Sequence, residues 1–486
     1  MGNNSSMPEY ISFTSPKLRE VMEKFSEVFT TSDIKFGVVG GAVRDYYWEC
    51  EPSDYDLVII GTDIGDVLEK LPDSFSYGNV CEVVNYEGFE IKVCQTFGAD
   101  IESRDYTINS AYAFYTMAGD YELVAPHGID DIKNKVLRFA NDPEVLVKKD
   151  PIKILRGLRL TAKYNLQIEK ETYYEIFRLR NHLINFDIPH SRVYTEMVKA
   201  FTSHHAYEFV RLLDEFELLE WYFPSVHALK GIDGGHYHNE TVFSHVLGAL
   251  KALDDTNLPF NLKLSALYHD VGKVKWEILP DGRRRFSNHN TFGEQLVECD
   301  LRRLNFPARV VTYAKTMVYH HMAQLDGKKS INKLMRALNK HKIPLKHFIY
   351  LRYADNKASH KNKSYFRDIW RRYRFCMKIL NPKYVPTITD LAINGNDIMK
   401  CLNIPPSKKV GDILKTLFEL WQDDKIENSR DKLIDAVKVI GGEDISLYET
   451  VLSDDDWNAL MEALNEPKEN EKLKSFMSEK FDVEIR

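Results

Sequence analysis

The sequence predicts an α+β protein, in which an N-terminal mixed sheet with helices is followed by domains built of helices alone. Short apolar runs typical of buried strands lie at residues 36–39, 57–60, 80–86 and 89–94. The last two runs are separated by Glu87-Gly88, a dipeptide that favours a hairpin turn. From residue 167 to residue 228 the pattern is helical, and we expect helices to the end of the chain.

Composition limits the class of protein. The 486 residues are enough for about three or four modules, and 44% of them are hydrophobic. The net charge is −7, so any contact with nucleic acid must use a local basic patch. The six cysteines form no C-x-x-C pair, and no apolar run has the length of a membrane span. We therefore expect a cytoplasmic protein with free thiols, no cysteine zinc site and no membrane partner.

A glycine turn follows the first predicted strand. Gly40 and Gly41 allow a sharp turn and a close approach to a ligand, and the next residues predict a helix start with Arg44 in its first turn. Backbone N–H groups and a guanidinium at such a turn are suited to a phosphate. Taken alone, the segment is equally explained as an ordinary glycine turn.

Two aspartates lead into the apolar run at residues 57–60. On a strand, side chains repeat every second residue, so Asp54 and Asp56 are predicted to project to the same face. Adjacent carboxylates repel one another unless a cation lies between them, and we expect this pair to bind two Mg²⁺ ions with a triphosphate. The alternative is a surface Asp pair. Glu90 is either a third carboxylate of the metal site or an exposed strand residue.

The turn and the Asp pair together resemble the GG-x-VRD and D-x-D motifs of the nucleotidyltransferase superfamily. More narrowly, they resemble the tRNA nucleotidyltransferases that add CCA, of the bacterial type shared with poly(A) polymerases. The resemblance implies a polymerase β-like head over residues 1–135, with Asp54 and Asp56 as catalytic and metal-binding residues. It also implies that Gly40, Gly41 and Arg44 contact the nucleotide.

Residues 101–114 are similar to the RRDFTINA motif of the same family. The resemblance implies that Arg104 reaches the nucleotide and that Asp105 orients it. For this motif alone, the alternative is an exposed helix start with Asp105 as its cap.

The stretch that ends near residue 166 resembles the family pattern EDPLR-x-LR-x-x-RF-A, whose Glu-Asp-x-x-Arg set recognises the Watson–Crick edges of CTP and ATP. Asp150 matches the Asp, whereas Lys149 replaces the Glu and Lys153 replaces the Arg. We expect Asp150 and Lys153 to read the base from one side of a helix, and Arg156 and Arg159 to hold phosphates. The alternative is a solvated basic helix face.

The helical segment 136–228 is expected to read the nucleotide. It is also expected to be the neck that joins the head to the rest of the chain. Within it, residues 187–199 resemble the family's connecting segment. Arg192 and Glu196 are four residues apart there, and we expect them to form a structural pair.

A second set of polar residues resembles the HD superfamily of metal-dependent phosphohydrolases. Its members, in chain order, are His245, His269, Asp270, His289, His320, His321 and Asp355. The resemblance implies a first metal ion bound by His245, His269, Asp270 and Asp355. It implies a second ion bound by His289 and one of the adjacent His320 and His321. Imidazole and carboxylate ligands suit a transition metal such as Mn²⁺, Fe²⁺ or Ni²⁺, and the alternative is a metal kept only for structure.

The resemblance assigns residues 229–380 to this HD domain and residues 381–486 to a helical tRNA-binding tail with an acidic extension. It implies template-independent addition of C, C and A from CTP and ATP to tRNA 3′ ends. It also implies hydrolysis of RNA 3′-terminal or 2′,3′-cyclic phosphates by the HD domain, in a monomer or a homodimer.

Three rival functions stay open. A poly(A) polymerase would use the same head, and an enzyme that adds only C or only A would fit the lysines at 149 and 153. In another class, an HD hydrolase would carry a non-catalytic RNA-binding head, although the Asp pair argues against this.

Overall fold

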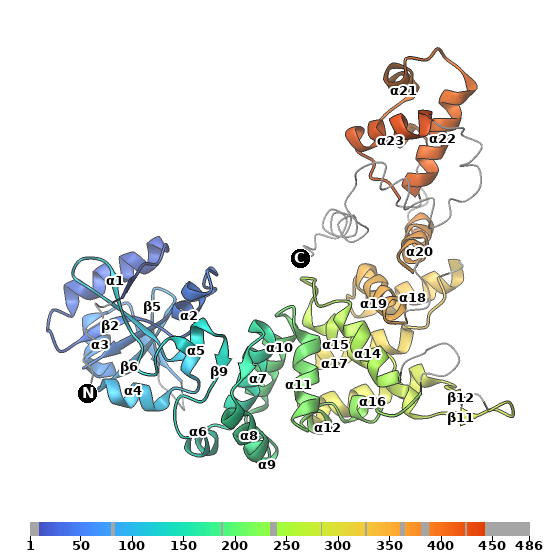
Figure 1. Cartoon of the computed structure of the whole chain (residues 1–486). Helices are drawn as coiled ribbons and strands as arrows, with labels where there is room; N and C mark the ends of the chain where they lie inside the picture. The colour runs from blue at the N-terminus through green and yellow to red at the C-terminus, as the bar shows by residue number, and fades with distance from the viewer. Residues whose placement is uncertain are drawn as a thin grey trace. The chain divides into compact units, whose positions relative to one another are not determined.

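The computed structural model divides the chain into two compact units, residues 1–196 and 197–486 (Figure 1). It describes residues 9–78, 83–185, 188–233, 241–282, 284–325, 328–359, 365–380, 388–422 and 425–442. The acidic extension from residue 443 onward lies outside the described residues. The four-part division expected from the sequence stays a prediction.

An eight-stranded mixed sheet forms the centre of the first unit, in the order β1-β8-β7-β2-β3-β6-β5-β4. Its strands are β1 (Tyr10–Ile11), β2 (Lys35–Val39), β3 (Asp56–Ile60), β4 (Phe75–Tyr77), β5 (Val83–Tyr86), β6 (Phe89–Cys94), β7 (Tyr112–Tyr115) and β8 (Tyr121–Val124). The pair β3–β6 is parallel and the other neighbouring strands are antiparallel. The strands predicted at residues 36–39, 57–60 and 89–94 and the α+β class are therefore confirmed. The strand predicted at residues 80–86 is confirmed from residue 83 onward, and residues 80–82 lie outside the described residues.

The predicted hairpin turn is confirmed as well. Tyr86 pairs with Phe89, which leaves Glu87 and Gly88 as a two-residue loop. Both loop residues have positive φ, 53° and 85°, as the mirror-image turns of tight hairpins require.

Short helices surround the sheet, and a run of helices follows it. They are α1 (Pro16–Val28), α2 (Gly41–Tyr47), α3 (Ile64–Lys70), α4 (Phe97–Ser103), α5 (Asp130–Lys133), α6 (Pro143–Lys149), α7 (Ile152–Tyr164), α8 (Lys170–Leu179) and α9 (His182–Asn185). A 3-10 turn at Thr107–Asn109 and the parallel pair β9 (Val136–Leu137) and β10 (Gln167–Ile168) complete the unit. Ser15 caps α1 by accepting a hydrogen bond from the backbone N–H of Leu18.

One face of the sheet packs against α4. Val39, Val58 and Ile60 form a buried cluster with Tyr112 and Phe114 on this face, and residues of α4 cover it. Because side chains alternate along a strand, Asp56 begins β3 on the same face as Val58. The packed core thus fixes the direction of the Asp56 side chain.

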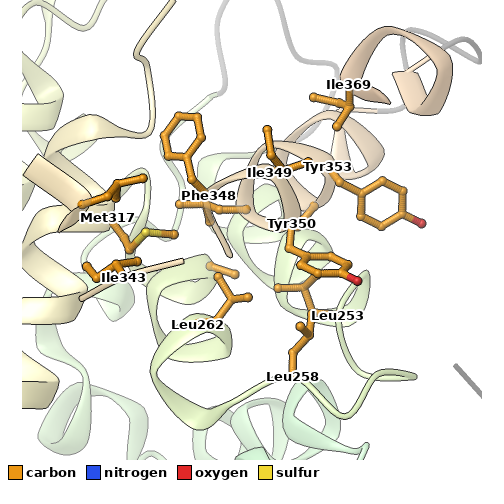
Figure 2. Packing of buried hydrophobic residues seen from close by; sticks show 14 of the residues in the cluster. Leu253, Leu258, Leu262, Met317, Ile343, Phe348, Ile349, Tyr350, Tyr353 and Ile369 are labelled. Carbon is orange, nitrogen blue, oxygen red and sulfur yellow. The ribbon is translucent and has the colours of Figure 1, made fainter. Parts of the chain in front are cut away.

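The second unit is mainly helical. Its elements are α10 (His190–Phe201, which begins in the first unit), α11 (Ala206–Glu215), α12 (Leu219–Tyr222), α13 (Pro224–His227), α14 (Val242–Lys251), α15 (Phe260–Tyr268), a 3-10 turn (Val271–Val274), the hairpin β11 (Glu277–Ile278) and β12 (Arg284–Arg285), α16 (His289–Arg303), α17 (Ala308–His320), α18 (Lys328–Lys340), α19 (Leu345–Ala358) and α20 (Tyr365–Leu380). Buried apolar side chains from α14, α15, α17, α18 and α19 form one core (Figure 2). This core holds α14, α15, α17 and α19, which carry or precede His245, His269, His321 and Asp355.

Three further helices, α21 (Gly395–Leu402), α22 (Lys408–Gln422) and α23 (Arg430–Gly442), pack around Ile398, Ile413 and Val437. Asn394 caps α21 in a capping box with Asp397. Five cysteines belong to the described residues and all five are free thiols, as expected. No helix in the described part of the chain is long and apolar enough to cross a membrane.

Candidate active site and metal centre

The glycine turn connects β2 to α2 and lies beside two of the predicted site residues. Gly40 has φ 78° and ψ −122°, a conformation that side chains with a Cβ rarely adopt. A Cβ atom added there would lie 3.9 Å from Nη1 of Arg104 and 4.0 Å from Oδ2 of Asp56. The structure therefore brings Gly40, Asp56 and Arg104 together at one end of the sheet.

Arg44 points into the protein and is only 5% exposed. Its Nε and Nη2 donate to Oδ1 of Asp45, Nη1 donates to Oδ1 of Asn109, and Nη2 also donates to the Tyr164 hydroxyl. These bonds connect α2 to the 3-10 turn and to α7. The expectation that this guanidinium is open to a phosphate is corrected: in this structure it supports the turn from inside.

The Asp pair is not on one strand as predicted. Asp56 is the first residue of β3, whereas Asp54 lies two residues before the strand, where it is exposed and accepts a bond from the Ser53 hydroxyl. In the parallel register Leu57 lies beside Ile91, so Asp56 and Glu90 precede neighbouring positions and project to the same face. Both are exposed, and Glu90 accepts a bond from the Tyr77 hydroxyl.

Arg104 and Asp105 are held by different partners. The Arg104 guanidinium pairs with the fully buried Asp100, and its Nη1 lies toward Gly40. Asp105 accepts from the backbone N–H of Tyr106 and from Nη1 of Arg156, so it orients Arg156 rather than Arg104. Burial alone would raise the pKa of the Asp105 carboxyl, but the charges of Arg156 and Lys153 lower it.

The predicted base-reading residues do not share one helix face. Asp150 ends α6, before α7 begins, so the expected helical spacing from Asp150 to Lys153 is corrected. Lys153 is 8% exposed and its Nζ donates to the carbonyl oxygen of Ser103. Arg192 instead binds Asp150 as a fork, with both N···O distances at 2.8 Å.

Arg156 and Arg159 pair with carboxylates of their own unit. Arg159 donates to Oε2 of Glu196 at 2.6 Å, and Nε of Arg156 lies 3.6 Å from Oε1 of the same residue. Arg192 and Glu196 therefore bind residues outside their own helix, which corrects the expected pairing between them. Arg156 is the more accessible of the two arginines, with 36% of its side chain exposed against 12% for Arg159.

Four histidines and two aspartates converge in the second unit. Nε2 of His245 and Nε2 of His269 lie 3.2 Å apart, at 3.6 and 3.4 Å from Oδ2 of Asp270. Oδ1 of Asp355 lies 3.3 Å from His245 and 3.7 Å from His269. These atoms come from α14, from the end of α15 and from α19.

A second pair of histidines faces the other oxygen of Asp270. Nε2 of His289 and Nε2 of His321 lie 3.2 Å apart, at 3.5 and 3.4 Å from Oδ1. Of the two adjacent histidines left open by the sequence, the cluster contains His321, while the His320 ring packs against Tyr319. Asp270 thus lies between two groups of metal-binding atoms.

The backbone fixes the orientation of three of these rings. Nδ1 of His269, His289 and His321 lies within hydrogen-bonding distance of the carbonyl oxygen three residues earlier in each case. A carbonyl can only accept, so these Nδ1 atoms carry the proton and the Nε2 lone pairs point into the cluster. Lone pairs and carboxylates that face one another fit a metal ion well, and the set suits one or two transition-metal ions.

Lys273 is the cation closest to Asp270 among their described contacts, with Nζ at 2.6 Å from Oδ2. Burial by itself would raise the pKa of the Asp270 carboxyl, but Lys273 and His269 hold it well below its usual value. The sequence did not predict the contact of Lys273 with Asp270 or the contact of Arg192 with Asp150. The signals were available, because Lys273 follows Asp270 by three residues and Arg192 belongs to the connecting segment.

A first prediction concerns Gly272, in the 3-10 turn after Asp270. A Cβ atom there would lie 1.8 Å from the carbonyl oxygen of His289 and 2.7 Å from the backbone N of Gly293. Backbone must therefore shift, and Gly272→Ala is expected to lower stability by about 1–3 kcal/mol and to displace His289. The unfolding temperature and the metal content should both decrease, while Gly411→Ala, in α22 with open space around it, should change neither.

The chain is similar to several known proteins. A family model described as "Probable RNA and SrmB-binding site of polymerase A" matches residues 165–230. The A-adding tRNA nucleotidyltransferase of Deinococcus radiodurans is 26% identical over 404 residues, which cover 79% of this chain and 90% of that protein. The CC-adding tRNA nucleotidyltransferase of Thermus thermophilus is 25% identical over 80% of this chain and 90% of its own.

Among solved structures, the CCA-adding enzyme of Bacillus stearothermophilus in complex with CTP has a TM-score of 0.52. It is 17% identical, and the match covers 88% of this chain and 98% of that one. This likeness concerns the fold. The chain is thus similar to tRNA nucleotidyltransferases over about four fifths of its length and has the α+β nucleotidyltransferase fold found in a CCA-adding enzyme.

Proposed function

We propose that this chain adds C, C and A from CTP and ATP to the 3′ end of tRNA without a template. One observation carries the proposal: the chain matches an A-adding and a CC-adding enzyme over four fifths of its length, with Gly40, Asp56 and Arg104 together at one end of its sheet. One relative is named for adding A and the other for adding CC, so neither name covers the whole of CCA. Addition of only C or only A is therefore the second candidate, and the lysines at 149 and 153 also favour it.

One assay separates these functions. The protein is incubated with tRNA that ends before CCA, with CTP and ATP singly and together, and the product is sized. Three added residues with both nucleotides support CCA addition, and stopping after two cytidines or one adenosine supports a partial enzyme. A long adenosine tract would indicate a poly(A) polymerase, and no product with any nucleotide would contradict the proposal.

Asp54 and Asp56 are the proposed ligands of two Mg²⁺ ions, with Glu90 as a third carboxylate from the neighbouring strand. Exposed carboxylates beside a glycine turn fit this ion, which prefers hard oxygen ligands and keeps part of its water. When bound, Mg²⁺ lowers the pKa of the RNA 3′-hydroxyl and neutralises the triphosphate. The turn at Gly40–Gly41 admits the phosphates closely, and Nη1 of Arg104 faces the same space.

The Asp150–Arg192 fork is our proposed reader of the base. C and A both present an exocyclic amine next to an unprotonated ring nitrogen, whereas U and G present a carbonyl next to a ring N–H. The Asp150 carboxylate can accept from the amine, and the Arg192 guanidinium can donate to the ring nitrogen, so the pair matches the first pattern and opposes the second. The fork is partly exposed, with 21% of the Asp150 side chain and 39% of the Arg192 side chain accessible, whereas Lys153 is buried.

This reading predicts a change of specificity in Arg192→Ala. The ratio of kcat/KM for CTP and ATP over that for UTP and GTP should decrease about tenfold or more, because an interaction of about 1–3 kcal/mol is lost. Lys153→Met should keep the ratio, since its Nζ is bonded to Ser103. Arg178→Ala, which removes an exposed fork to Glu175 on α8, is the matched control. If the kcat/KM ratio changes only in the Lys153 variant, Lys153 and not Arg192 reads the base.

The histidine–aspartate cluster supports a second activity, hydrolysis of a phosphate at an RNA 3′ end, and a 2′,3′-cyclic phosphate in particular. A transition metal such as Mn²⁺ or Ni²⁺, bound by the four Nε2 atoms and the two aspartates, would make water acidic enough to attack near neutral pH. The water oxygen bonds to phosphorus, one ring P–O bond breaks, and the released ribose oxygen takes up a proton. A terminal phosphate blocks the hydroxyl that the first unit requires, so the two activities are complementary.

Free thiols are consistent with a reducing compartment, and the cytoplasmic location stays a prediction. Whether the enzyme is a monomer or a homodimer also stays a prediction.

A further inference from the structure

A small hairpin stands between two of the cluster's residues. The segment 275–288, here called the arm, follows the 3-10 turn after Asp270 and ends directly before His289. Its strands β11 and β12 pair through Glu277–Arg285 and Ile278–Arg284. Figure 1 shows it reaching away from the helices of its unit, beyond α16. The described part of the arm does not contribute to the hydrophobic core of the unit.

The arm has two apolar side chains that are exposed to solvent. Trp276 is 40% exposed and Ile278 is 65% exposed. The guanidinium of Arg284 lies 4.6 Å from the Trp276 ring centroid, which holds the indole in a fixed orientation. An indole ring beside a guanidinium is a surface on which an unpaired base can stack.

The charge of the arm is opposite to that of the whole chain. Lys275 and the three arginines at 283–285 outnumber Glu277 and Asp281, which leaves a net charge of +2 on fourteen residues of a chain whose net charge is −7. Arg283 lies outside the described residues and is counted from the sequence alone. The side chain of Arg285 is 64% exposed, and its Nε lies 3.7 Å from Oε1 of the similarly accessible Glu277, a weak surface pair that a polyanion can displace.

Phe286, near the C-terminal end of the arm, contacts two residues of the histidine–aspartate cluster and its surroundings. Lys273, which contacts Asp270, lies over the Phe286 ring, with Nζ 5.6 Å from its centroid. Nδ1 of His289 is bonded to the carbonyl oxygen of Phe286. Arg285 is four residues from His289, a reach of at most about 14 Å along the chain. This is on the order of two nucleotides of extended RNA.

We propose that the arm binds the last nucleotides of a single-stranded RNA 3′ end and presents the terminal phosphate to the histidine–aspartate cluster. A base stacks on Trp276, while Lys275, Arg284 and Arg285 neutralise the phosphates that precede it. The inference rests on the proposed phosphohydrolase activity and deepens it. The substrate is an RNA chain end, and a mononucleotide reaches the cluster without using the arm.

The test compares two substrates that carry the same reactive group. Hydrolysis of 2′,3′-cyclic AMP and of a short oligonucleotide ending in a 2′,3′-cyclic phosphate is measured with Mn²⁺ or Ni²⁺. The variants are Trp276→Ala and the double variant R284A/R285A. The matched control is Trp221→Ala, because Trp221 is 38% exposed and also carries a guanidinium, that of Arg303, 5.0 Å from its ring centroid.

Each arm variant should raise KM for the oligonucleotide about tenfold, the size expected for one lost base stack, and leave kcat/KM for cyclic AMP within about twofold. The Trp221 control should change neither value. Equal losses on both substrates would mean that the arm only supports the cluster, and unchanged KM values would mean that it does not bind RNA. Either result overturns the proposal.

A second measurement separates failure of the arm from failure of the hydrolase. An oligonucleotide with 4-thiouridine next to its 3′ end is irradiated with the full-length protein, and the crosslinked peptide is mapped. Crosslinking to residues 275–288 that is lost in Trp276→Ala supports the arm even if neither cyclic substrate is hydrolysed. No crosslink to this segment in the wild type contradicts the arm, whatever the hydrolase does.

Discussion

Replacing Asp56 by alanine is expected to reduce nucleotide addition to tRNA by at least about 1,000-fold, with little effect on folding. Asp56 is exposed at the start of β3, beside the Gly40 turn and in register with Glu90, so under the proposed two-metal assignment its loss removes a metal ligand without opening the core. The measurement is single-nucleotide incorporation with Mg²⁺, and thermal unfolding serves as the check on folding.

Asp54→Ala should have a similar effect, although Asp54 lies before the strand and has more freedom to move. Asp73→Ala removes an exposed carboxylate elsewhere in the same unit and should leave activity unchanged. Incorporation that persists within about tenfold of the wild type in Asp56→Ala would refute the two-metal assignment.

Replacing Asp270 by alanine is expected to remove hydrolysis of 2′,3′-cyclic AMP and to release the bound metal. The two oxygens of Asp270 face two different histidine pairs, all within 3.4–3.6 Å, so one substitution affects both groups of ligands. Metal content is measured by mass spectrometry after exchange into Mn²⁺ or Ni²⁺. Asp270→Asn is tested alongside, because it keeps the side-chain volume next to Lys273 and distinguishes lost metal binding from lost packing.

Nucleotide addition to a clean 3′-hydroxyl should survive in these variants. His321→Ala and His320→Ala form a matched pair, since the first removes a cluster residue and the second removes its neighbour beside Tyr319. If the His320 variant loses metal and the His321 variant does not, the second group of ligands is wrongly assigned. A wild-type protein without hydrolytic activity toward any cyclic phosphate would leave the cluster as a structural metal site.

Local pattern was sufficient for several features. Alternating and continuous apolar runs predicted the strands β2, β3 and β6, and Glu87-Gly88 predicted the hairpin, because the apolar pattern of a strand and the conformation of a tight turn are encoded by neighbouring residues. The histidine set was also visible in the sequence. Its members are spread over more than 100 residues, so they were assigned to one site from the resemblance to the HD superfamily and not from their spacing.

Partners of the charged groups could not be predicted in the same way. Arg44, Arg156 and Arg159 were expected at phosphates, yet each pairs with a carboxylate or hydroxyl of its own unit, since a guanidinium that folding buries must be satisfied there. Lys153 and Arg192 also have partners other than the predicted ones. Lys153 is buried and donates to a backbone carbonyl, whereas Arg192, 42 positions from Asp150, donates to the Asp150 carboxylate.

The sequence by itself determined the α+β class, the strands that carry the glycine turn and Asp56, and the identity of the histidine–aspartate set. Only the tertiary structure decided which charges face one another, that His321 rather than His320 joins the cluster, and that Asp270 stands between two histidine pairs. The physical reason is the distance along the chain over which each interaction acts. Strand and turn preferences act over a few residues, whereas ion pairs and metal ligands are selected by the packing of helices that are distant in the chain.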